Sequence, residues 1–238
     1  MSDKILLTIA ARGGSKGVKN KNIRELCGKP LIAHTILQAK WWGKADKIIC
    51  TTDSLDISRV AREYGAEVPF LRPPELATDT AGKLDALRHA LKSMETLTEM
   101  QFSVIVDLDP TAPIRKVSDI ECAYQLFLQK KANCVFSVVP CRKNPYFNMV
   151  ELNAEGFTHL VKTLPVPLLR RQDAPKVFDA NASIYIYDRE FLLKEETNSV
   201  VGARSAVWVM DDFAAFDIDT ELDFQFIEFL VEKKLIEL

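Results

Sequence analysis

Short apolar runs alternate with segments of helical periodicity through the first 140 residues, and this alternation constrains the fold most strongly. The apolar runs are typical of buried strands, and the segments between them place apolar residues on one helical face. Strands that are joined by single helices pair in parallel through right-handed crossovers. The pattern predicts an α/β fold, a Rossmann-like three-layer sandwich with a mostly parallel sheet. The expected strands cover residues 5–11, 47–52, 65–70, 102–108 and 134–140, and the expected helices cover 31–41, a segment ending near 64, 81–94 and 118–130.

The first strand runs directly into a loop rich in glycine and positive charge. Three glycines fall within five residues, and Arg12, Ser15 and Lys16 lie beside them. Glycine lets the main chain approach a ligand, so successive N–H groups can cradle an anion while the side-chain cations add positive charge. Three further polar residues extend the lining, Lys19, Lys21 and Asn22. We therefore expect phosphate to bind here.

The spacing within this loop excludes two familiar phosphate-binding motifs. Neither G-x-x-x-x-G-K-[ST] nor the dinucleotide pattern G-x-G-x-x-G fits the residues. A glycine-rich turn with solvated lysines is the structural alternative, and for any one residue it is the better interpretation. Because six such residues directly follow a buried strand, we favour the phosphate loop.

Polar residues also collect where the next strands end. Asp53 and Ser54 follow the second strand, although capping of the next helix explains them better than chemistry does. The segment Thr78-Asp79-Thr80 is expected to cap the helix after that. Ligands of parallel sheets bind at the carboxyl ends of the strands, which places the site in the first half of the chain. The end of strand 102–108 contributes Asp107, Asp109 and Thr111.

The pattern changes after residue 140, where short strands follow one another without long helices between them. Such a segment is too short to be stable alone, so residues 140–190 are expected to form a small antiparallel excursion from a single domain of residues 1–238. It would pack on the main sheet or on a second subunit. The stretch Leu164-Pro165-Val166-Pro167 is typical of an extended arm at an interface. The strand-like runs cover residues 147–152, 157–161, 182–187 and 207–210.

Two carboxylates, Asp217 and Asp219, precede a closing helix at residues 220–234. Their offset of two places both on one side of an extended chain, a geometry that suits Mg²⁺. Charge at a helix N-terminus is the alternative explanation. Because the loop after the first strand is expected to bind phosphate, we favour the metal site over the helix-terminus explanation. The helix is expected to bury Phe224, Ile227, Phe229, Leu230 and Val231.

The composition limits the kinds of partner that this protein is expected to bind. A formal net charge of −2 over 238 residues gives no global basic field, so nucleic acid is not expected to bind. Five cysteines without a C-x-x-C pair are typical of buried thiols in a reduced cytoplasmic protein. We see no apolar stretch of the roughly 20 residues that span a bilayer, and we expect no membrane partner.

Several motifs together resemble those of the CMP-sialic acid synthetases, also called acylneuraminate cytidylyltransferases. The similarity covers nearly the whole chain, and the motifs stand in the order of that family. They are Ala10-Ala11-Arg12-Gly13-Gly14-Ser15-Lys16-Gly17-Val18-Lys19-Asn20-Lys21-Asn22 with Gly28-Lys29-Pro30-Leu31, then Asp109-Pro110-Thr111-Ala112-Pro113-Ile114-Arg115 (Q-P-T-S-P-L-R in the family), Asn181-Ala182-Ser183-Ile184-Tyr185 (N-G-A-I-Y) and Asp217-Ile218-Asp219 (D-I-D).

The resemblance implies transfer of CMP from CTP to a nonulosonic acid, a nine-carbon 2-keto sugar acid, with release of pyrophosphate. It implies Mg²⁺ on Asp217 and Asp219, and a homodimer built through the excursion. The implied triphosphate-binding, catalytic residues are Arg12, Lys16 and Lys21, and the implied nucleotide-binding residues are Ala11, Gly13, Gly14, Ser15, Asn22, Arg72 and Lys83. The implied acceptor-sugar residues are Asp109, Thr111, Arg115, Arg171, Asp179 and Asn181.

Three departures resemble the branch of the family that activates legionaminic acid, a diamino relative of sialic acid. Asp109 replaces a sugar-contacting glutamine, Lys83 a serine and Asp179 an arginine. Ionised aspartate only accepts hydrogen bonds, so it suits an acceptor with an additional amide N–H. The alternatives are N-acetylneuraminate, another keto-sugar acid, a sugar 1-phosphate, or a regulatory module that binds nucleotide without catalysis.

Overall fold

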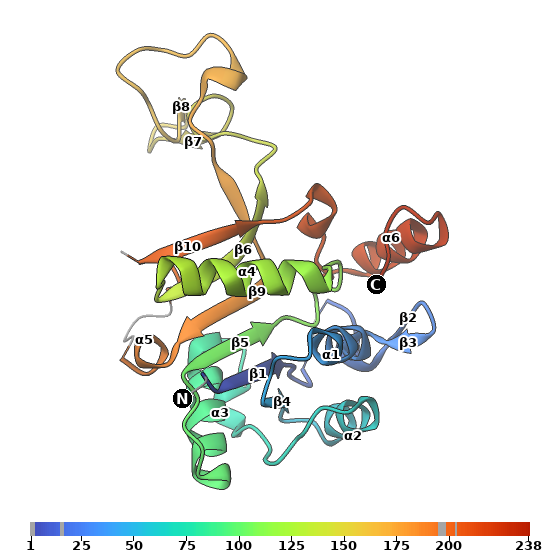
Figure 1. Cartoon of the computed structure of the whole chain (residues 1–238). Helices are drawn as coiled ribbons and strands as arrows, with labels where there is room; N and C mark the ends of the chain where they lie inside the picture. The colour runs from blue at the N-terminus through green and yellow to red at the C-terminus, as the bar shows by residue number, and fades with distance from the viewer. Residues whose placement is uncertain (1–2, 15–16, 195–198, 203) are drawn as a thin grey trace.

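The computed structural model describes residues 3–14, 17–194, 199–202 and 204–238, and a six-stranded sheet forms its centre (Figure 1). The strand order is β10-β6-β9-β5-β1-β4. The pairs β1–β4, β1–β5 and β6–β10 are parallel, whereas β9 runs antiparallel to β5 and β6. The strands are β1 (Ile5–Ala10), β4 (Lys47–Thr51), β5 (Val104–Leu108), β6 (Cys134–Pro140), β9 (Phe178–Asp188) and β10 (Ser205–Val209).

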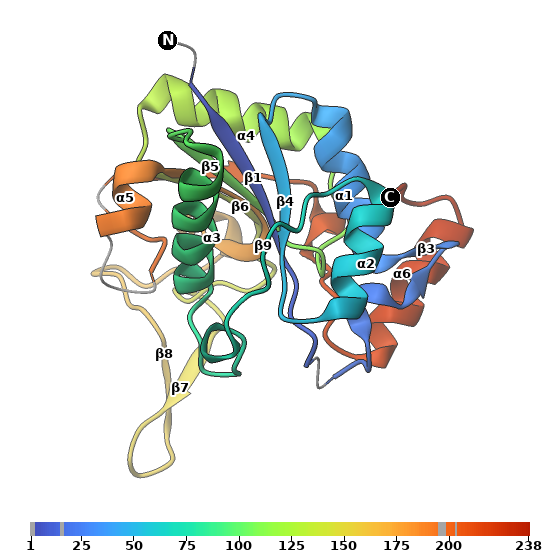
Figure 2. The same cartoon turned by 90° about the horizontal axis from the view of Figure 1, so that it is seen from below.

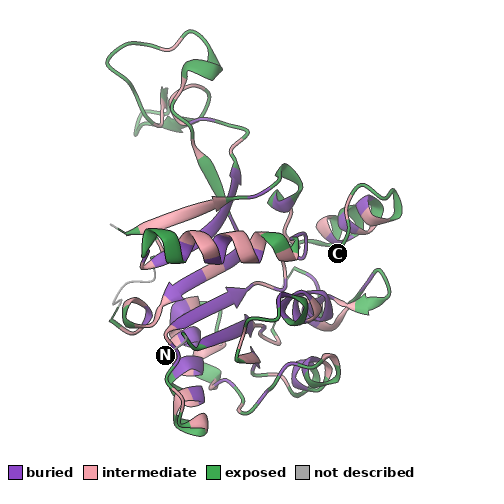
Figure 3. Cartoon of the chain, viewed as in Figure 1, coloured by how far each residue is buried: buried purple, intermediate pink, exposed green. Residues whose placement is uncertain are grey.

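Helices cover both faces of this sheet (Figure 2). Leu7 and Ile9 of β1 lie in a core with the helices α1 (Leu31–Trp42), α2 (Leu55–Tyr64) and α4 (Val117–Lys130). Leu6, on the opposite face, lies in a core with α3 (Lys83–Thr98) and α5 (Arg189–Lys194). Successive strand residues point to opposite faces, so a strand that is apolar throughout needs a helical layer on each side. The central strands are accordingly buried (Figure 3). The predicted three-layer sandwich with a mostly parallel sheet is confirmed.

The helices follow the predicted pattern closely, with small differences at their ends. Ser54 caps α2 by accepting a hydrogen bond from Ile57 N, so the capping interpretation of Ser54 is confirmed. The segment Thr78-Asp79-Thr80 does not cap α3, because that helix begins at Lys83 with Gly82 as its N-cap. The helices are α1 (Leu31–Trp42), α2 (Leu55–Tyr64), α3 (Lys83–Thr98), α4 (Val117–Lys130), α5 (Arg189–Lys194) and α6 (Glu221–Glu232).

The expected strand at residues 65–70 is wrong, since only a single parallel bridge joins Glu67 to Ile49. Glu67 exchanges two backbone hydrogen bonds with the strand β4. Pro69 follows two residues later and has no N–H to continue the ladder.

The strand expected at residues 182–187 belongs to the main sheet and not to the excursion. Within β9, Ile184 and Ile186 lie in one core and Tyr187 lies in the other, so both faces of this strand are covered. The register between β6 and β9 shifts between Phe136 and Val138. The chain therefore returns from the excursion as a central strand, which is why β9 runs against its neighbours.

The excursion is correspondingly shorter, and it projects from the ends of β6 and β9 (Figure 1). It spans residues 141–177 and contains an antiparallel hairpin, β7 (Val150–Leu152) with β8 (Thr158–Leu160). The short 3-10 helix η3 (Arg171–Asp173) lies in its returning half. Most of its residues are exposed.

The helix α6 closes the chain against the segment after the first strand. Its N-cap Thr220 and Asp223 form a reciprocal capping box. Phe224, Ile227 and Leu230 are buried as expected, but Phe229 is 48% exposed, so the buried face is narrower than predicted. Among the helices that the structure describes, we find none with the length and apolar character that crossing a membrane requires.

Candidate active site

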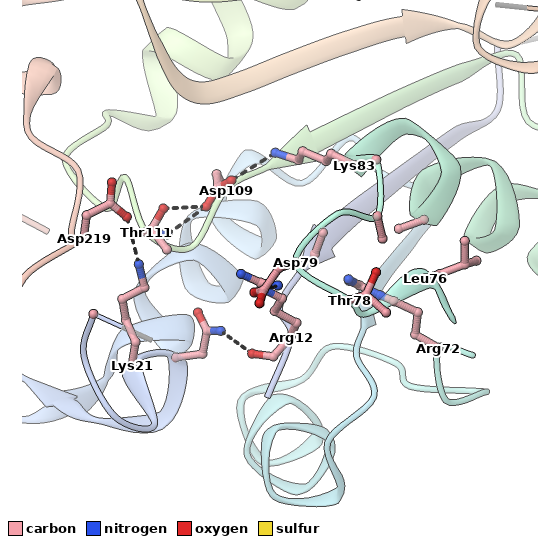
Figure 4. A pocket seen from close by; sticks show the side chains of 16 residues that line it. Arg12, Lys21, Arg72, Leu76, Thr78, Asp79, Lys83, Asp109, Thr111 and Asp219 are labelled. Atoms are coloured by element: carbon pink, nitrogen blue, oxygen red, sulfur yellow. Dashed lines mark hydrogen bonds and ion pairs between the residues drawn. The ribbon is translucent and has the colours of Figure 1, made fainter. Parts of the chain in front are cut away.

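A cavity of about 540 Å³ opens where the strands β1 and β5 end (Figure 4). Segments from both halves of the chain form its wall. Half of the predicted site residues that the structure describes meet there. The predicted site residues lining it are Arg12, Lys21, Asn22, Arg72, Lys83, Asp109, Thr111 and Asp219.

The loop after β1 is held by the end of the neighbouring strand β4. Ala11 N donates to Thr51 O at 3.1 Å, and Gly13 N donates to the Asp53 carboxylate at 2.9 Å. The buried Asn22 side chain donates to Arg12 O at 3.1 Å. These bonds fix the main chain on both sides of Arg12. Asp53 thus supports the loop rather than capping α2.

The Arg12 side chain crosses the mouth of the cavity to Asp79. Its Nη1 lies 2.8 Å from Asp79 Oδ1. Asp79 belongs to the segment that the sequence predicted to cap α3. In the sequence, Asp79 is distinguished only as part of a polar stretch between Pro74 and the helix. Asp79 is therefore a site residue that sequence reasoning missed, as are Thr78 and Gly82, which also line the cavity.

Lys21 joins the loop to the acidic pair before α6. Its side chain is 12% exposed, and Nζ donates to Ile218 O and, at 3.2 Å, to Asp219 Oδ1. A Cβ added at Gly17 would lie 1.9 Å from Asp219 O, so only glycine permits this approach. The two segments are about 200 positions apart in the sequence, yet they pack directly against each other.

The acidic pair has the chemistry of a cation site. Burial raises the pKa of Asp217, and the nearby carboxylates of Asp219 and Asp109 raise it further. Asp219 faces the cavity with a side chain that is 74% exposed. A divalent cation bound here would offset this crowding of like charges. Within the described ranges no group of three or more His, Cys, Asp or Glu side chains is placed to hold a metal. Two carboxylates suffice for Mg²⁺, which keeps waters and substrate oxygens in its shell, so the residues fit this ion.

The opposite wall is formed by Asp109 and the cation beside it. Thr111 donates to Asp109 Oδ1 through its N–H at 3.0 Å and its hydroxyl at 2.8 Å, and Lys83 Nζ lies 3.0 Å from Oδ2. Burial raises the pKa of Asp109, but Lys83 and Thr111 outweigh this effect and hold it below its usual value. Asp109 is therefore an ionised acceptor of hydrogen bonds.

Arg72 forms part of the floor. It is buried, and its guanidinium donates to Thr51 O at 2.5 Å and to Thr51 Oγ1 at 3.3 Å. Burial lowers its pKa, an effect that nearby carboxylates partly offset. The side chain thus lies at the cavity while the end of β4 fixes its orientation.

Two predicted acceptor residues are buried away from the cavity lining. Arg115 donates to Gln38, Thr35, Ser183 O and Asp109 O, and burial lowers its pKa to about 10. Asn181 accepts from Ser137 and donates to Ala214 O at 2.9 Å. Both side chains brace the loops that carry Asp109 and the chain before Asp217.

Two other acceptor candidates lie at the base of the excursion. Arg171 donates to Cys141 O at 3.1 Å, and Asp179 lies beside Cys141. Arg171 lines a separate hollow of about 460 Å³. In one copy of the chain these two residues do not reach the cavity at the carboxyl ends of the strands.

The remaining predicted residues differ in what the structure says of them. Ala11, Gly13 and Gly14 form the loop without lining the cavity, and Asp217 is not among the residues that line it. Ser15 and Lys16 lie outside the described residues. Their assignments remain predictions from the sequence.

The fold and the cavity define a nucleotidyltransferase, an α/β enzyme with a cationic loop at the end of its first strand. The chain belongs to the cytidylyltransferase family, whose model, described as "Cytidylyltransferase", matches residues 6–237. The resemblance found in the sequence motifs is confirmed at this level.

Known proteins similar to this chain support the same family. A CMP-N,N'-diacetyllegionaminic acid synthase from Campylobacter jejuni is 46% identical over 97% of this chain and 96% of its own length. A protein from Campylobacter coli named post-translational flagellin modification protein B is 44% identical over 98% and 97%. Among solved structures, CMP:2-keto-3-deoxy-manno-octonic acid synthetase complexed with CTP aligns with a TM-score of 0.70 at 17% identity, covering 98% of this chain and all of that one. This last similarity concerns the fold.

Proposed function

We propose that this enzyme transfers CMP from CTP to a nonulosonic acid of the legionaminic type and releases pyrophosphate. The observation that carries the proposal is the convergence of Arg12, Lys21 and Asp219 on one cavity. Two cations and a carboxylate at the end of β1 suit a triphosphate with its counter-ion. The name of the Campylobacter jejuni relative supports the choice of acceptor.

In the proposed reaction the anomeric hydroxyl of the acceptor attacks the α-phosphorus of CTP. A bond forms between the anomeric oxygen and phosphorus, the bond from phosphorus to the bridging oxygen breaks, and pyrophosphate leaves with that oxygen. The hydroxyl proton passes to solvent or to a bound base. No covalent intermediate with the protein is needed, so positioning and charge neutralisation supply the catalysis.

The residues of this chain would divide the work by their place in the cavity. Arg12 and Lys21 offset charge on the phosphates, with Lys16 proposed as a third cation from the sequence. Asn22 and Arg72 line the nucleotide part of the cavity. Asp217 and Asp219 would hold Mg²⁺, which when bound neutralises charge on the triphosphate.

We place the acceptor against the wall formed by Asp109 and Thr111. Arg115 and Asn181 would act indirectly, by bracing the loops described above. Arg171 and Asp179 would serve the site of a second copy, because they lie at the base of the excursion. The proposal thus includes a homodimer of single-domain chains. Because its substrates are a nucleotide and a sugar acid, we also propose a cytoplasmic location.

The test is an acceptor panel. The enzyme would be incubated with CTP, Mg²⁺ and single synthetic nonulosonic acids, including N,N'-diacetyllegionaminate and N-acetylneuraminate. Pyrophosphate would be assayed and products weighed by mass spectrometry. We expect the CMP adduct of the legionaminate to form fastest. Equal or faster turnover of N-acetylneuraminate would contradict the acceptor, and CTP binding without pyrophosphate release would contradict catalysis.

A further inference from the structure

A buried charge cluster ties the first residue of α3 to the strands β1, β5 and β9. Lys83 Nζ lies 2.7 Å from Asp107 Oδ2, 3.0 Å from Asp109 Oδ2 and 4.7 Å from the ring centroid of Tyr185. Asp107 is fully buried, and its other oxygen accepts a hydrogen bond from Thr8 at 2.8 Å. The ammonium is thus anchored from below by an aspartate that has no access to a ligand.

These contacts direct Lys83 to the Asp109 wall. The family resemblance assigned this position, where the family has a serine, to nucleotide binding. In Figure 4 its ammonium points at Asp109 and not at Arg12. Its side chain is only 33% exposed, and each of its measured polar and ring contacts is to β5 or β9 or to the loop after β5.

Lys83 also determines how Asp109 is presented to the cavity. A carboxylate offers about four lone pairs. Thr111 occupies two of them on Oδ1, and Lys83 occupies one on Oδ2. One lone pair of Oδ2 therefore remains for a ligand, and the carboxylate plane that aims it is held from both sides.

We propose that Lys83 is a positioning residue for the acceptor: anchored by Asp107, it orients Asp109 so that one oxygen accepts a hydrogen bond from an N–H or O–H of the sugar acid. Lys83 acts through Asp109 and leaves nucleotide binding unchanged. This inference rests on the proposed function, because it assigns a part of the same cavity. The recognised chemistry is an acylamido N–H or a hydroxyl group.

The first experiment separates an acceptor role from a nucleotide role. Steady-state constants for CTP and for N,N'-diacetyllegionaminate would be measured for the wild type, Lys83→Met and Lys83→Arg. In Lys83→Met we expect kcat/KM for the acceptor to fall by about 10- to 100-fold, while KM for CTP changes less than about threefold. Lys83→Arg keeps the charge and should recover part of the loss. A rise in KM for CTP with an unchanged KM for the acceptor would overturn the inference.

The second experiment asks whether Lys83 acts through Asp109. In the variant Asp109→Asn, adding Lys83→Met should change kcat/KM for the acceptor by less than about threefold, because the oriented carboxylate is already lost. If the two losses multiply instead, Lys83 contacts the acceptor independently and the inference fails.

Folding needs its own control, because Lys83→Met leaves two buried carboxylates without their cation. Arg189→Met is the matched control: it breaks the pair, at 2.8 Å, between Arg189 of α5 and Glu95 of the same helix α3, and both residues lie outside the cavity lining. We expect it to lower the unfolding temperature and leave both KM values unchanged. If Lys83→Met does not fold, the constants of Lys83→Arg for CTP and for the acceptor decide between the two roles.

The outcomes distinguish this inference from the proposed function. A wild type that releases no pyrophosphate with any nonulosonic acid refutes both. An active wild type whose Lys83 variants lose CTP affinity and keep acceptor selectivity refutes the inference alone.

Discussion

At the scale of single residues, the cavity pairs Arg12, which we propose to bind phosphate, with an internal competitor. Asp79 Oδ1 lies 2.8 Å from Arg12 Nη1, where a phosphate oxygen would be favourable. Both side chains are more than one-third exposed, so water screens the pair. Such pairs contribute about 0–1 kcal/mol. When a phosphate oxygen replaces Asp79 as the partner of Arg12, the free energy of nucleotide binding is therefore reduced only slightly.

We predict that Asp79→Asn lowers KM for CTP, by at most about fivefold, because about 1 kcal/mol is the most that such a pair contributes. The acceptor KM should not change. Asp56→Asn, which breaks an exposed pair with Arg59 on α2, is the control. A higher KM for CTP would mean that Asp79 supports the loop rather than competing with the ligand.

Replacement of Arg12 itself should have a far larger effect. Arg12→Ala removes a cation aimed at charge that grows in the transition state, so kcat/KM for CTP should fall by about 100-fold or more. The unfolding temperature should stay within about 2 °C, since the lost pair is exposed. Arg59→Ala on α2 is the control. Unchanged turnover would leave the loop with a purely structural role.

The acidic pair predicts a response to metal. Because burial and two nearby carboxylates raise the pKa of Asp217, its charged form disfavours the folded state at neutral pH. Asp217→Asn should therefore raise the unfolding temperature without Mg²⁺, and Mg²⁺ should raise it in the wild type only. Calorimetry with and without Mg²⁺ measures both effects. Equal stabilisation of the variant by Mg²⁺ would place the ion elsewhere.

At the scale of elements, the site depends on packing between the loop after β1 and the segment before α6. Lys21 donates to Ile218 O, and Ile218 N donates to Thr111 O at 2.8 Å. The same backbone stretch therefore contacts the loops that follow both β1 and β5. Its place is secured by the bidentate pair between Arg24 and Glu221 on α6.

Gly17→Ala tests this packing. The added Cβ would lie 1.9 Å from Asp219 O, which is backbone and cannot move aside cheaply. We expect kcat/KM to fall by about tenfold or more as the two segments separate, measured by pyrophosphate release. Gly202→Ala is the matched control, because its Cβ would meet nothing nearer than Ser205 Oγ at 3.7 Å. Full activity of Gly17→Ala would show that the close approach is not needed.

Most elements could be predicted because their signals are local. Buried strands such as β1 and β5 are continuous apolar runs, and α2 has Ser54 at its start. The partner of β9 could not be predicted, because a strand buried on both faces reads alike in a parallel and an antiparallel position. The strand predicted at residues 65–70 was wrong because the apolar pattern was present but Pro69 limited the pairing to a single bridge.

At the scale of the whole molecule, the excursion of residues 141–177 carries apolar side chains into solvent. Leu169 is 91% exposed, and further exposed apolar residues lie along the same segment. An exposed apolar surface on a projecting arm is typical of an interface. The others include Leu152, Phe157 and Val166.

We predict that the protein is a dimer in solution and that the double variant Phe157→Asp/Leu169→Asp is a folded monomer. Burying a charged side chain at the interface would cost more free energy than the association provides. Light scattering gives the mass, and circular dichroism checks the fold. Leu55→Asp, at a leucine on α2 that is 74% exposed, should keep the dimer mass. A monomeric wild type would remove the homodimer and the roles of Arg171 and Asp179 in a neighbouring site.

The sequence by itself determined the class of fold and located the loop proposed to bind phosphate and the acidic pair proposed to hold Mg²⁺, because each is written in adjacent residues whose spacing has a direct physical meaning. Only the tertiary structure decided that Asp79 faces Arg12, that Lys83 faces Asp109, and that Arg115 is a buried brace. These facts depend on contacts between segments far apart in the chain. Side-chain direction there is set by packing and charge pairing in three dimensions, which no local pattern encodes.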